Sequence, residues 1–324
     1  MFEAFRALTA SGLGVIDVGA RDGTHPAFQE IAPLVELVGF EPDAEECAQL
    51  NAAPAPSGFR SVTYLPHALG AGDAEDTLHL CRSGGASSLL APDRPFLDRF
   101  PGADRFDVVT TCTVETKALD DIRSQETDPL PAYVGLIKVD TQGTELGILT
   151  GARGTLAEVS AVEVEVEFAP LYKSQPLFRD VDRFMAELGF SLFKLRRMQW
   201  VRDVAGVLPS RSAGQLVFGD ALYLRDPLAG GGTARLDDPR QAEALVLLAC
   251  LYDCHDFALE LIGEPAIAGS VDAVGIKRYI KRRSRRSRLG GLWKRRADRL
   301  SFFSWLRGYS SNWSRGDLDF YSRV

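Results

Sequence analysis

Four acidic residues stand at or just after the ends of short apolar runs: Asp17, Glu41, Asp140 and Glu167. The runs have the length and composition of buried β-strands. In an open α/β sheet, ligands bind outside the carboxyl ends of the strands, so these four side chains are expected to converge. Carboxylates in such a place can accept hydrogen bonds from the hydroxyl groups of a ligand or remove a proton from one of them.

A glycine-punctuated loop, Gly19-Ala20-Arg21-Asp22-Gly23, follows the first run. Its two glycines allow a tight turn and a close approach to a ligand. Thr24 as an N-cap, with Pro26 in the first turn, predicts a helix whose free N–H groups point at the same place. The spacing G-x-x-x-G lacks the dinucleotide fingerprint, so the loop favours a nucleoside without phosphate, of which S-adenosylmethionine is the commonest. An ordinary βαβ turn is the alternative.

The carboxylates have distinct expected roles. Glu41, at the end of the second strand, can accept both hydroxyls of a ribose. Asp140 ends a central strand, where it can remove a proton from a substrate hydroxyl, hold the amino group of the cofactor's methionine, or cap the next helix. Glu167 can orient the substrate or act as the base. The alternation of Glu163, Glu165 and Glu167 with valines is equally typical of a half-exposed strand face.

The elements that position these residues alternate along the first 224 residues. Strands are expected over residues 13–18, 34–40, 62–66, 133–139, 161–168, 190–195 and 215–224. Helices are expected over residues 44–51, 119–124, 145 to about 156, 180–188 and, further on, in 238–262. This pattern predicts an α/β sandwich with a mostly parallel seven-stranded sheet. Residues 77–82 and 106–115 alternate as strands do and predict a hairpin-like insertion, and Ala68, after the third strand, is expected near the adenine.

Charge is distributed unevenly along the chain. The net charge is −7. Residues 1–276 hold 22 Lys and Arg against 41 Asp and Glu, whereas residues 277–324 hold 15 Lys and Arg against 3 Asp. The basic segment also contains Trp293, Phe302, Phe303, Trp305 and Trp313. Arginines beside aromatic rings favour an anionic membrane surface. Binding to nucleic acid is a weaker expectation, and docking on the acidic body is the plain alternative.

These observations predict three parts: residues 1–229, which bind the cofactor, a helical extension over 230–276, and the basic aromatic tail, 277–324. The longest apolar runs are shorter than a membrane span, and the first residues lack the features of a signal peptide, so we expect a cytoplasmic protein. Five scattered cysteines fit a reducing compartment and give no zinc spacing, and no metal site is expected. The oligomeric state is not predictable from the sequence.

Five segments in order carry a resemblance to a known family: VIDVGARDG, VGFEPD, ASSLL, LIKVDTQGTELGILTGA and VEVEFAPLYKSQPLF, the last followed by DVDRFMAELGFSLFKL. Over about residues 13–225 the chain resembles the FkbM family of methyltransferases. The resemblance implies a class I Rossmann-like fold, S-adenosylmethionine as the methyl donor, and usually O-methylation of a sugar or secondary metabolite. Arg21 stands where the family more often has asparagine. Thr141-Gln142 replaces the commoner valine-glutamate, and the carboxylate missing at Gln142 argues against a metal.

The resemblance also implies roles for residues. The expected cofactor-binding residues are Asp17, Gly19, Arg21, Gly23, Glu41, Pro42, Ala68 and Asp140. The expected substrate-binding residues are Ser88, Glu145, Tyr172 and Gln175. The expected catalytic residues are Asp140 and Glu167.

The sequence thus leads to one main hypothesis, an S-adenosylmethionine-dependent O-methyltransferase that acts on a hydroxyl of a small molecule or glycan with a carboxylate base. One alternative is an RNA methyltransferase whose tail holds phosphates. Another is a membrane-associated module that holds the nucleoside without turnover.

Overall fold

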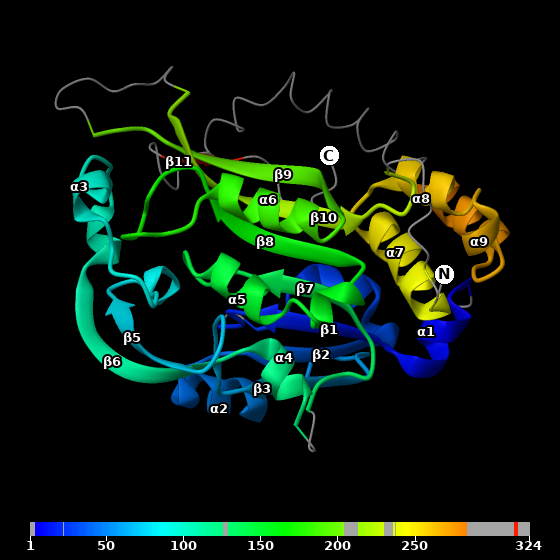
Figure 1. The fold of residues 1–324 in the computed structure, drawn as a ribbon, viewed down its shortest axis with the longest axis horizontal. Coiled ribbons are helices and arrows are strands. Elements are labelled where there is room, and N and C mark those ends of the chain that lie inside the picture. The colour runs from blue at the N-terminus through cyan, green and yellow to red at the C-terminus, as the bar shows by residue number, and fades with distance from the viewer. Residues whose placement is uncertain are drawn as a thin grey trace.

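A sheet of eight strands runs through the protein in the order β11-β9-β10-β8-β7-β1-β2-β3 (Figure 1). The computed structural model describes residues 4–21, 23–125, 129–203, 213–229, 236, 238–283 and 314–316. The strands are β1 (Leu13–Val18), β2 (Val35–Phe40), β3 (Ser61–Leu65), β7 (Val134–Val139), β8 (Ala161–Glu167), β9 (Phe190–Trp200), β10 (Gln215–Arg225) and β11 (Ser314–Gly316). Five neighbouring strands, β3 to β8, pair in parallel, and β10 runs antiparallel between β8 and β9. The expected mostly parallel seven-stranded sheet is confirmed, and β11 adds an edge strand antiparallel to β9.

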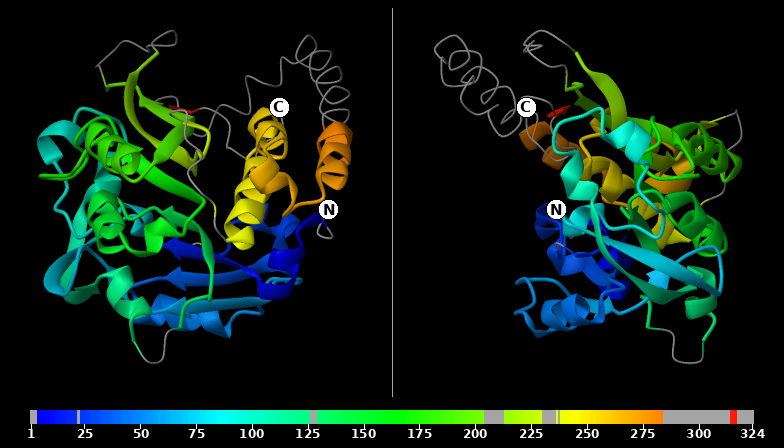
Figure 2. Two further views of the ribbon diagram at one scale, coloured as in Figure 1. Left: turned by 45° about the vertical axis from the view of Figure 1, so that its right-hand side comes forward. Right: turned by 90° about the vertical axis from the view of Figure 1, so that its left-hand side faces the viewer.

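Helices cover both faces of the sheet, which explains why the central strands are apolar on both sides (Figure 2). On one face, Leu13 and Val15 of β1 belong to a core with α1 (Arg6–Ser11), α2 (Ala44–Ala52), α7 (Pro239–Leu251), α8 (His255–Leu261) and a helix over residues 273–283. On the other face, Ile16 and Val18 pack with α4 (Leu119–Arg123), α5 (Glu145–Gly151) and α6 (Phe178–Glu187). The short helix α9 (Pro265–Ala268) lies beside α7 and α8 (Figure 1).

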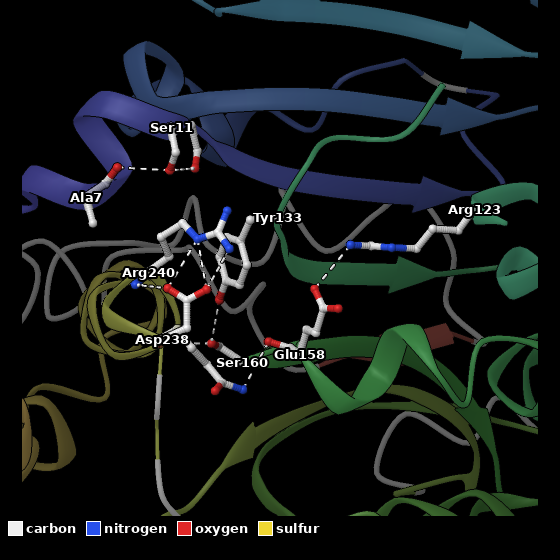
Figure 3. A network of polar contacts seen from close by, with 10 residues as sticks. Ala7, Ser11, Arg123, Tyr133, Glu158, Ser160, Asp238 and Arg240 are labelled. Atoms are coloured by element: carbon white, nitrogen blue, oxygen red, sulfur yellow. Dashed lines mark hydrogen bonds and ion pairs between the residues drawn. The ribbon is translucent and has the colours of Figure 1, made fainter. Parts of the chain in front are cut away.

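The helical extension is joined to the amino ends of the strands. At the start of α7, Asp238 accepts hydrogen bonds from Arg240, whose guanidinium lies 5.1 Å from the ring centre of Tyr133 (Figure 3). Tyr133 contacts Ser160 at 3.2 Å, and the Ser160 hydroxyl donates to the carbonyl of Gln241. These contacts lie at the amino ends of β7 and β8, at the opposite edge of the sheet from Asp140 and Glu167.

The predicted insertion is present as a second sheet, in which β6 (Val108–Lys117) pairs antiparallel with β5 (Ala74–Cys81) and parallel with the short β4 (Ala68–Leu69). Between β5 and β6 the chain forms α3 (Arg94–Leu97) and short 3-10 turns at residues 84–86 and 103–106. Phe106 of this segment packs against Tyr172 and Trp200, with ring centres 5.9 and 6.2 Å apart. The insertion therefore packs against the loop after β8 and the end of β9.

The α-helix expected after Thr24 is wrong. Residues Pro26–Glu30 and Ala32–Leu34 form two short 3-10 helices, and His25 rather than Thr24 supplies the capping atom, with Nδ1 accepting from Ala27 N at 3.2 Å. The second proline, Pro33, has no N–H to continue a helix, and too few residues precede β2 to form one. The expected row of free helical N–H groups aimed at the glycine loop is therefore not formed.

Candidate active site

The loops that follow β1 and β7 touch at the carboxyl edge of the sheet. Asp140 N donates to Val18 O at 3.0 Å. Gly19 has a φ of 84°, and a Cβ built on it would lie 2.0 Å from Asp140 O. Gly23 also has a positive φ, 74°, but a Cβ there would meet nothing closer than 3.7 Å. Gly19 is thus required by close packing, whereas Gly23 is required only by its backbone conformation.

Asp17 is buried at 2% exposure and pairs with Lys138, with Nζ 3.1 Å from Oδ1. Burial raises the pKa of Asp17, an effect that Lys138 opposes. The sequence did not identify Lys138 as a partner, although it was the one charged residue in an apolar strand opposite Asp17. Asp17 therefore forms an internal ion pair that links β1 to β7.

Glu41 follows β2 beside the glycine loop and is 5% exposed. Its Oε1 accepts the N–H of Asp43 at 2.9 Å, across Pro42, and its Oε2 makes no hydrogen bond to the residues that the structure describes. Burial raises the pKa of Glu41, while the charge of Arg21 lowers it. Arg21 itself contacts Glu46 at 3.7 Å. The expected neighbours Arg21, Glu41 and Pro42 thus lie together, with one carboxylate oxygen available.

Glu145 shapes the turn between β7 and α5. Its Oε1 accepts from the N–H and hydroxyl of Thr141 at 2.9 and 3.2 Å, and Gly143 N lies 3.0 and 2.9 Å from its two oxygens. It is 2% exposed, and burial raises its pKa to about 7. Thr144, not Asp140, is the N-cap residue of α5, so the expectation of Asp140 as a helix cap is wrong.

The side chain of Gln142 connects its own turn to β8 and to the loop after β8. Its φ is 61°, a left-handed conformation that the hydrogen bonds of Glu145 help to hold. Its Nε2 donates to Asp140 Oδ1 at 3.1 Å and to Glu165 Oε2 at 2.6 Å, while its Oε1 accepts from Tyr172 at 3.2 Å. The amide fixes the orientation of Asp140, which is half-buried at the edge of the site. Asp140 Oδ2 has no hydrogen bond within the described ranges.

The glutamates of β8 are buried, so the half-exposed strand face considered from the sequence is wrong. Glu163 accepts from the hydroxyl of Tyr252 at 2.7 Å. Glu165 is held by Gln142, and Glu167 Oε1 is buried with no hydrogen-bond partner. Burial, and then neighbouring carboxylates, raise the pKa of Glu165 and of Glu167 well above the ordinary range.

The expected substrate residues mostly make framework contacts. The Tyr172 hydroxyl, fully buried, lies 2.9 Å from Ala86 O, and the Ser88 hydroxyl donates to Gln142 O at 2.7 Å. Gln175 Oε1 accepts from the N–H groups of residues 171 and 172 at 2.7 and 2.9 Å, which fixes its amide. Gln175 Nε2 is buried beside the Glu167 carboxyl and makes no hydrogen bond of ordinary length to the residues that the structure describes.

Ala68 lies in β4 of the second sheet, 6% exposed and paired with Thr116. The neighbouring Gly70 packs against α5, since a Cβ on Gly151 would lie 2.2 Å from Gly70 O. The contacts of Ala68 are those of a packing residue, and its contact with adenine stays a prediction.

The family comparison follows this geometry. The sequence profile described as the methyltransferase FkbM domain matches residues 17–192, more than half of the chain. The chain belongs to the FkbM family of methyltransferases. The match begins at Asp17 near the end of β1 and covers the glycine loop, β2, the Asp140–Glu145 turn and the β8 glutamates. The chain is a methyltransferase with S-adenosylmethionine as its cofactor. Comparison with curated proteins gives no match.

Three solved structures are similar to this chain, each with low sequence identity and a low TM-score. Magnesium protoporphyrin IX methyltransferase of Synechocystis PCC 6803, with bound SAM, is 9% identical, covering 68% of this chain and 76% of that protein, with a TM-score of 0.32. The putative tRNA (m1A22) methyltransferase Sp1610 of Streptococcus pneumoniae is 12% identical, covering 85% and 97%, with a TM-score of 0.34. TrmK of M. capricolum, in complex with S-adenosylhomocysteine, is 6% identical, covering 87% and 97%, with a TM-score of 0.34. These values carry no argument about the acceptor of this FkbM protein.

The site fits the cofactor. Gly19 and Gly23 carry no side chain at the two ends of the loop, and Glu41 Oε2 is available for ribose hydroxyls at the end of β2. S-adenosylmethionine, when bound, supplies an electrophilic methyl group on a sulfonium. In this FkbM protein, Asp140 and the buried carboxyls of Glu165 and Glu167 make this edge of the sheet acidic.

Proposed function

We propose that this FkbM protein methylates a hydroxyl oxygen of a sugar, a glycan or a hydroxylated secondary metabolite, with Asp140 as the base. The observation that carries the proposal is the placement of Asp140. It lies against the cofactor loop, half-buried, with one oxygen held by Gln142 at 3.1 Å and the other without a hydrogen bond in the described chain. Such a carboxylate is fixed in orientation and can still accept a proton.

A hydroxyl acceptor explains two further groups. Gln175 Nε2 is a buried donor beside the Glu167 carboxyl, and Asp140 is an acceptor. A hydroxyl group can accept a hydrogen bond from the first kind of group and donate one to the second. Methyl transfer is an in-line displacement, so positioning supplies most of the rate and the base removes the hydroxyl proton.

Glu167 is the other candidate for the base, but its raised pKa makes it less suited to accept a proton. Burial, and then neighbouring carboxylates, raise the pKa of Glu167, which disfavours the ionised form that a base requires. Asp140 is closer to the cofactor loop, because the backbone at Asp140 is in contact with Gly19.

The test is methyl transfer from labelled S-adenosylmethionine to a panel of sugars, lipid-linked glycans and hydroxylated metabolites, with products identified by the added mass of one CH2 group. Asp140→Asn keeps the shape and should lower kcat by roughly a hundredfold or more. Asp121→Asn, an exposed change on α4, is the matched control. Full kcat in Asp140→Asn would reject Asp140 as the base. A selective loss of cofactor affinity would assign it to the methionine amino group instead.

We further propose that the enzyme acts at the cytoplasmic surface of an anionic membrane, beside a lipid-linked acceptor. Most of the basic tail, with its Trp and Phe residues, lies outside the described residues. Its first turns are described: the helix over 273–283 buries Ile276 and Ile280 and exposes Lys277, Arg278, Lys281 and Arg282. No helix in the described ranges is long and apolar enough to cross a bilayer. Each basic residue near an anionic surface contributes about 1 kcal/mol of binding.

Liposome flotation tests this location. Wild type should float with vesicles that contain phosphatidylserine, less so at high salt, and reversal of the four exposed charges to Glu should weaken the association. This variant is cleaner than truncation near residue 273, which would also remove the buried Ile276 and Ile280. Equal, negligible flotation of both proteins would reject the proposal. Tight, salt-sensitive binding to RNA with no flotation would favour an RNA acceptor.

A further inference from the structure

Three buried glutamates meet where β8 ends and α5 begins. Glu145, Glu165 and Glu167 each offer a carboxylate oxygen, and these oxygens lie within 4.8 Å of one another. The residues are 2%, 7% and 2% exposed. Among the residues that the structure describes, no Lys, Arg or His forms an ion pair with any of them. The neighbouring cations Lys138 and Arg196 are paired with Asp17 and Asp220, respectively.

Three ionised carboxylates at this separation repel one another strongly. Two unit charges about 5 Å apart cost about 3 kcal/mol at an effective dielectric constant of about 20, and burial adds the loss of hydration. The cluster, which we call the glutamate trio, must therefore be neutralised by protons or by a cation.

The pattern of occupied oxygens leaves positions at which a cation could bind. Glu145 Oε1 is saturated by Thr141 and Gly143, but Oε2 has a single donor, Gly143 N. Glu165 Oε2 accepts from Gln142, and its Oε1 has no hydrogen bond within the described chain. Each member of the trio thus keeps an oxygen with unused lone pairs.

A second observation is independent of this proximity. Glu167 Oε1 is shielded from solvent and makes no hydrogen bond of ordinary length to the residues that the structure describes, although the amide of Gln175 lies beside its carboxyl. A buried acceptor without a donor costs free energy, and native proteins rarely keep one unless a ligand or ion occupies the place beside it. This oxygen belongs to a carboxyl that faces the other two members of the trio.

We infer that Glu145, Glu165 and Glu167 bind a divalent cation of the hard, oxygen-preferring class, such as Mg²⁺ or Mn²⁺. Carboxylate oxygens are the ligands that these ions select, and three of them leave coordination positions for water or for hydroxyl groups. A dication also removes most of the repulsion within the trio. Glu167 then acts as a ligand, which is consistent with Asp140 as the base.

The replacement at position 142 does not oppose this site. The sequence argued against a metal because Gln142 stands where a carboxylate is commoner. In the structure Gln142 is outside the trio, and its amide orients Glu165 through a 2.6 Å hydrogen bond. A role for the ion in holding the acceptor hydroxyl rests on the proposed function, whereas ion binding itself does not.

The test is direct cation binding to the full-length protein after treatment with a chelator, without cofactor or acceptor. Mn²⁺ is titrated and followed by electron paramagnetic resonance, with Mg²⁺ as competitor. Wild type should bind a single ion per chain at the trio. Glu165→Gln and Glu167→Gln should each weaken this binding by roughly tenfold or more. Glu243→Gln is the matched control, because Glu243 is a buried glutamate that accepts the N–H groups of Ala7 and Leu8 on α1.

Two results would overturn the inference. One is an absence of saturable Mn²⁺ binding by wild type. The other is binding that persists unchanged in both trio variants, provided that circular dichroism shows them folded. If a variant does not fold, Glu165→Asp, which keeps the charge, replaces it, and it should bind more weakly than wild type. Because no methyl transfer is measured, a wrong acceptor class cannot produce either result.

Discussion

At the scale of single residues, Glu41 is placed to decide cofactor affinity. Its free Oε2 at the end of β2 is the group available for ribose. Glu41→Ala should weaken binding of S-adenosylmethionine by about 1–3 kcal/mol, the loss of a charge-assisted hydrogen bond. Titration calorimetry measures this, with Glu36→Ala on the same strand as the control, because Glu36 pairs with Arg60 instead. Equal affinity in wild type and Glu41→Ala would contradict the assignment.

The amide of Gln142 donates a hydrogen bond to each of two carboxylates, Asp140 and Glu165, and so affects how readily they ionise. Gln142→Glu would replace the amide donor between Asp140 and Glu165 with a third carboxylate. Without a cation, the added repulsion should raise the pH at which activity appears and lower turnover at neutral pH. The measurement is the pH profile of kcat/KM, with Gln142→Met as the variant that removes the donor without adding charge. An unchanged profile in Gln142→Glu would show that the amide does not act on Asp140.

At the scale of elements, the backbone contact between the loops after β1 and β7 sets how closely these two loops approach each other. Gly19→Ala would place a Cβ 2.0 Å from Asp140 O at a φ of 84°. It should destabilise the protein by about 2–5 kcal/mol, because backbone strain and overpacking add. Gly23→Ala, at a φ of 74° with no neighbour closer than 3.7 Å, should show only the strain, about 1–2 kcal/mol. Urea unfolding measures both, and equal losses would show that the contact is not limiting.

The sequence predicted the elements with the clearest periodicity. The apolar runs of β1, β2, β7 and β8 were recognisable because strands covered on both faces are continuously apolar. The segment 24–34 was not, since Thr24 and Pro26 give the local signal of a helix while the short connection and Pro33 prevent one. Tertiary constraint prevailed over local preference there.

The site was predictable in part for a related reason. Glu41, Asp140 and Glu167 could be found because each follows an apolar run. The trio could not, since Glu145 comes from the helix after β7, and no spacing along the chain reports that its carboxylate meets Glu165. The ion pair of Asp17 with Lys138 depends on strand register, which the sequence does not state.

At the scale of the whole molecule, the glutamate trio makes stability depend on pH. Its carboxyls have folded-state pKa values above their unfolded values, so their ionisation is penalised by folding. The stability they contribute is fully present below the unfolded pKa, about 4.5, and declines as pH rises from there through the folded value, which for Glu145 is about 7. Asp140, Gln142, Gln175 and Asp220 face the trio.

Metal-free protein in chelator should therefore melt at a lower temperature at pH 8 than at pH 6, and Glu167→Gln should reduce the difference by removing one ionising group. Thermal unfolding followed by circular dichroism provides the measurement. A melting temperature that rises from pH 6 to pH 8 in chelator would contradict the linkage.

The insertion has a practical consequence for handling the protein. Residues 108–113 of β6 are exposed and uncharged, and β5 occupies one edge of the strand. On the other edge, β4 reaches only Thr116 and Lys117, so within the described residues the preceding backbone donors and acceptors have no strand beside them. Such an edge is a template for aggregation by strand addition when the enzyme is concentrated or warmed. A lysine at Thr111 is thus a solubility substitution outside the proposed catalytic machinery.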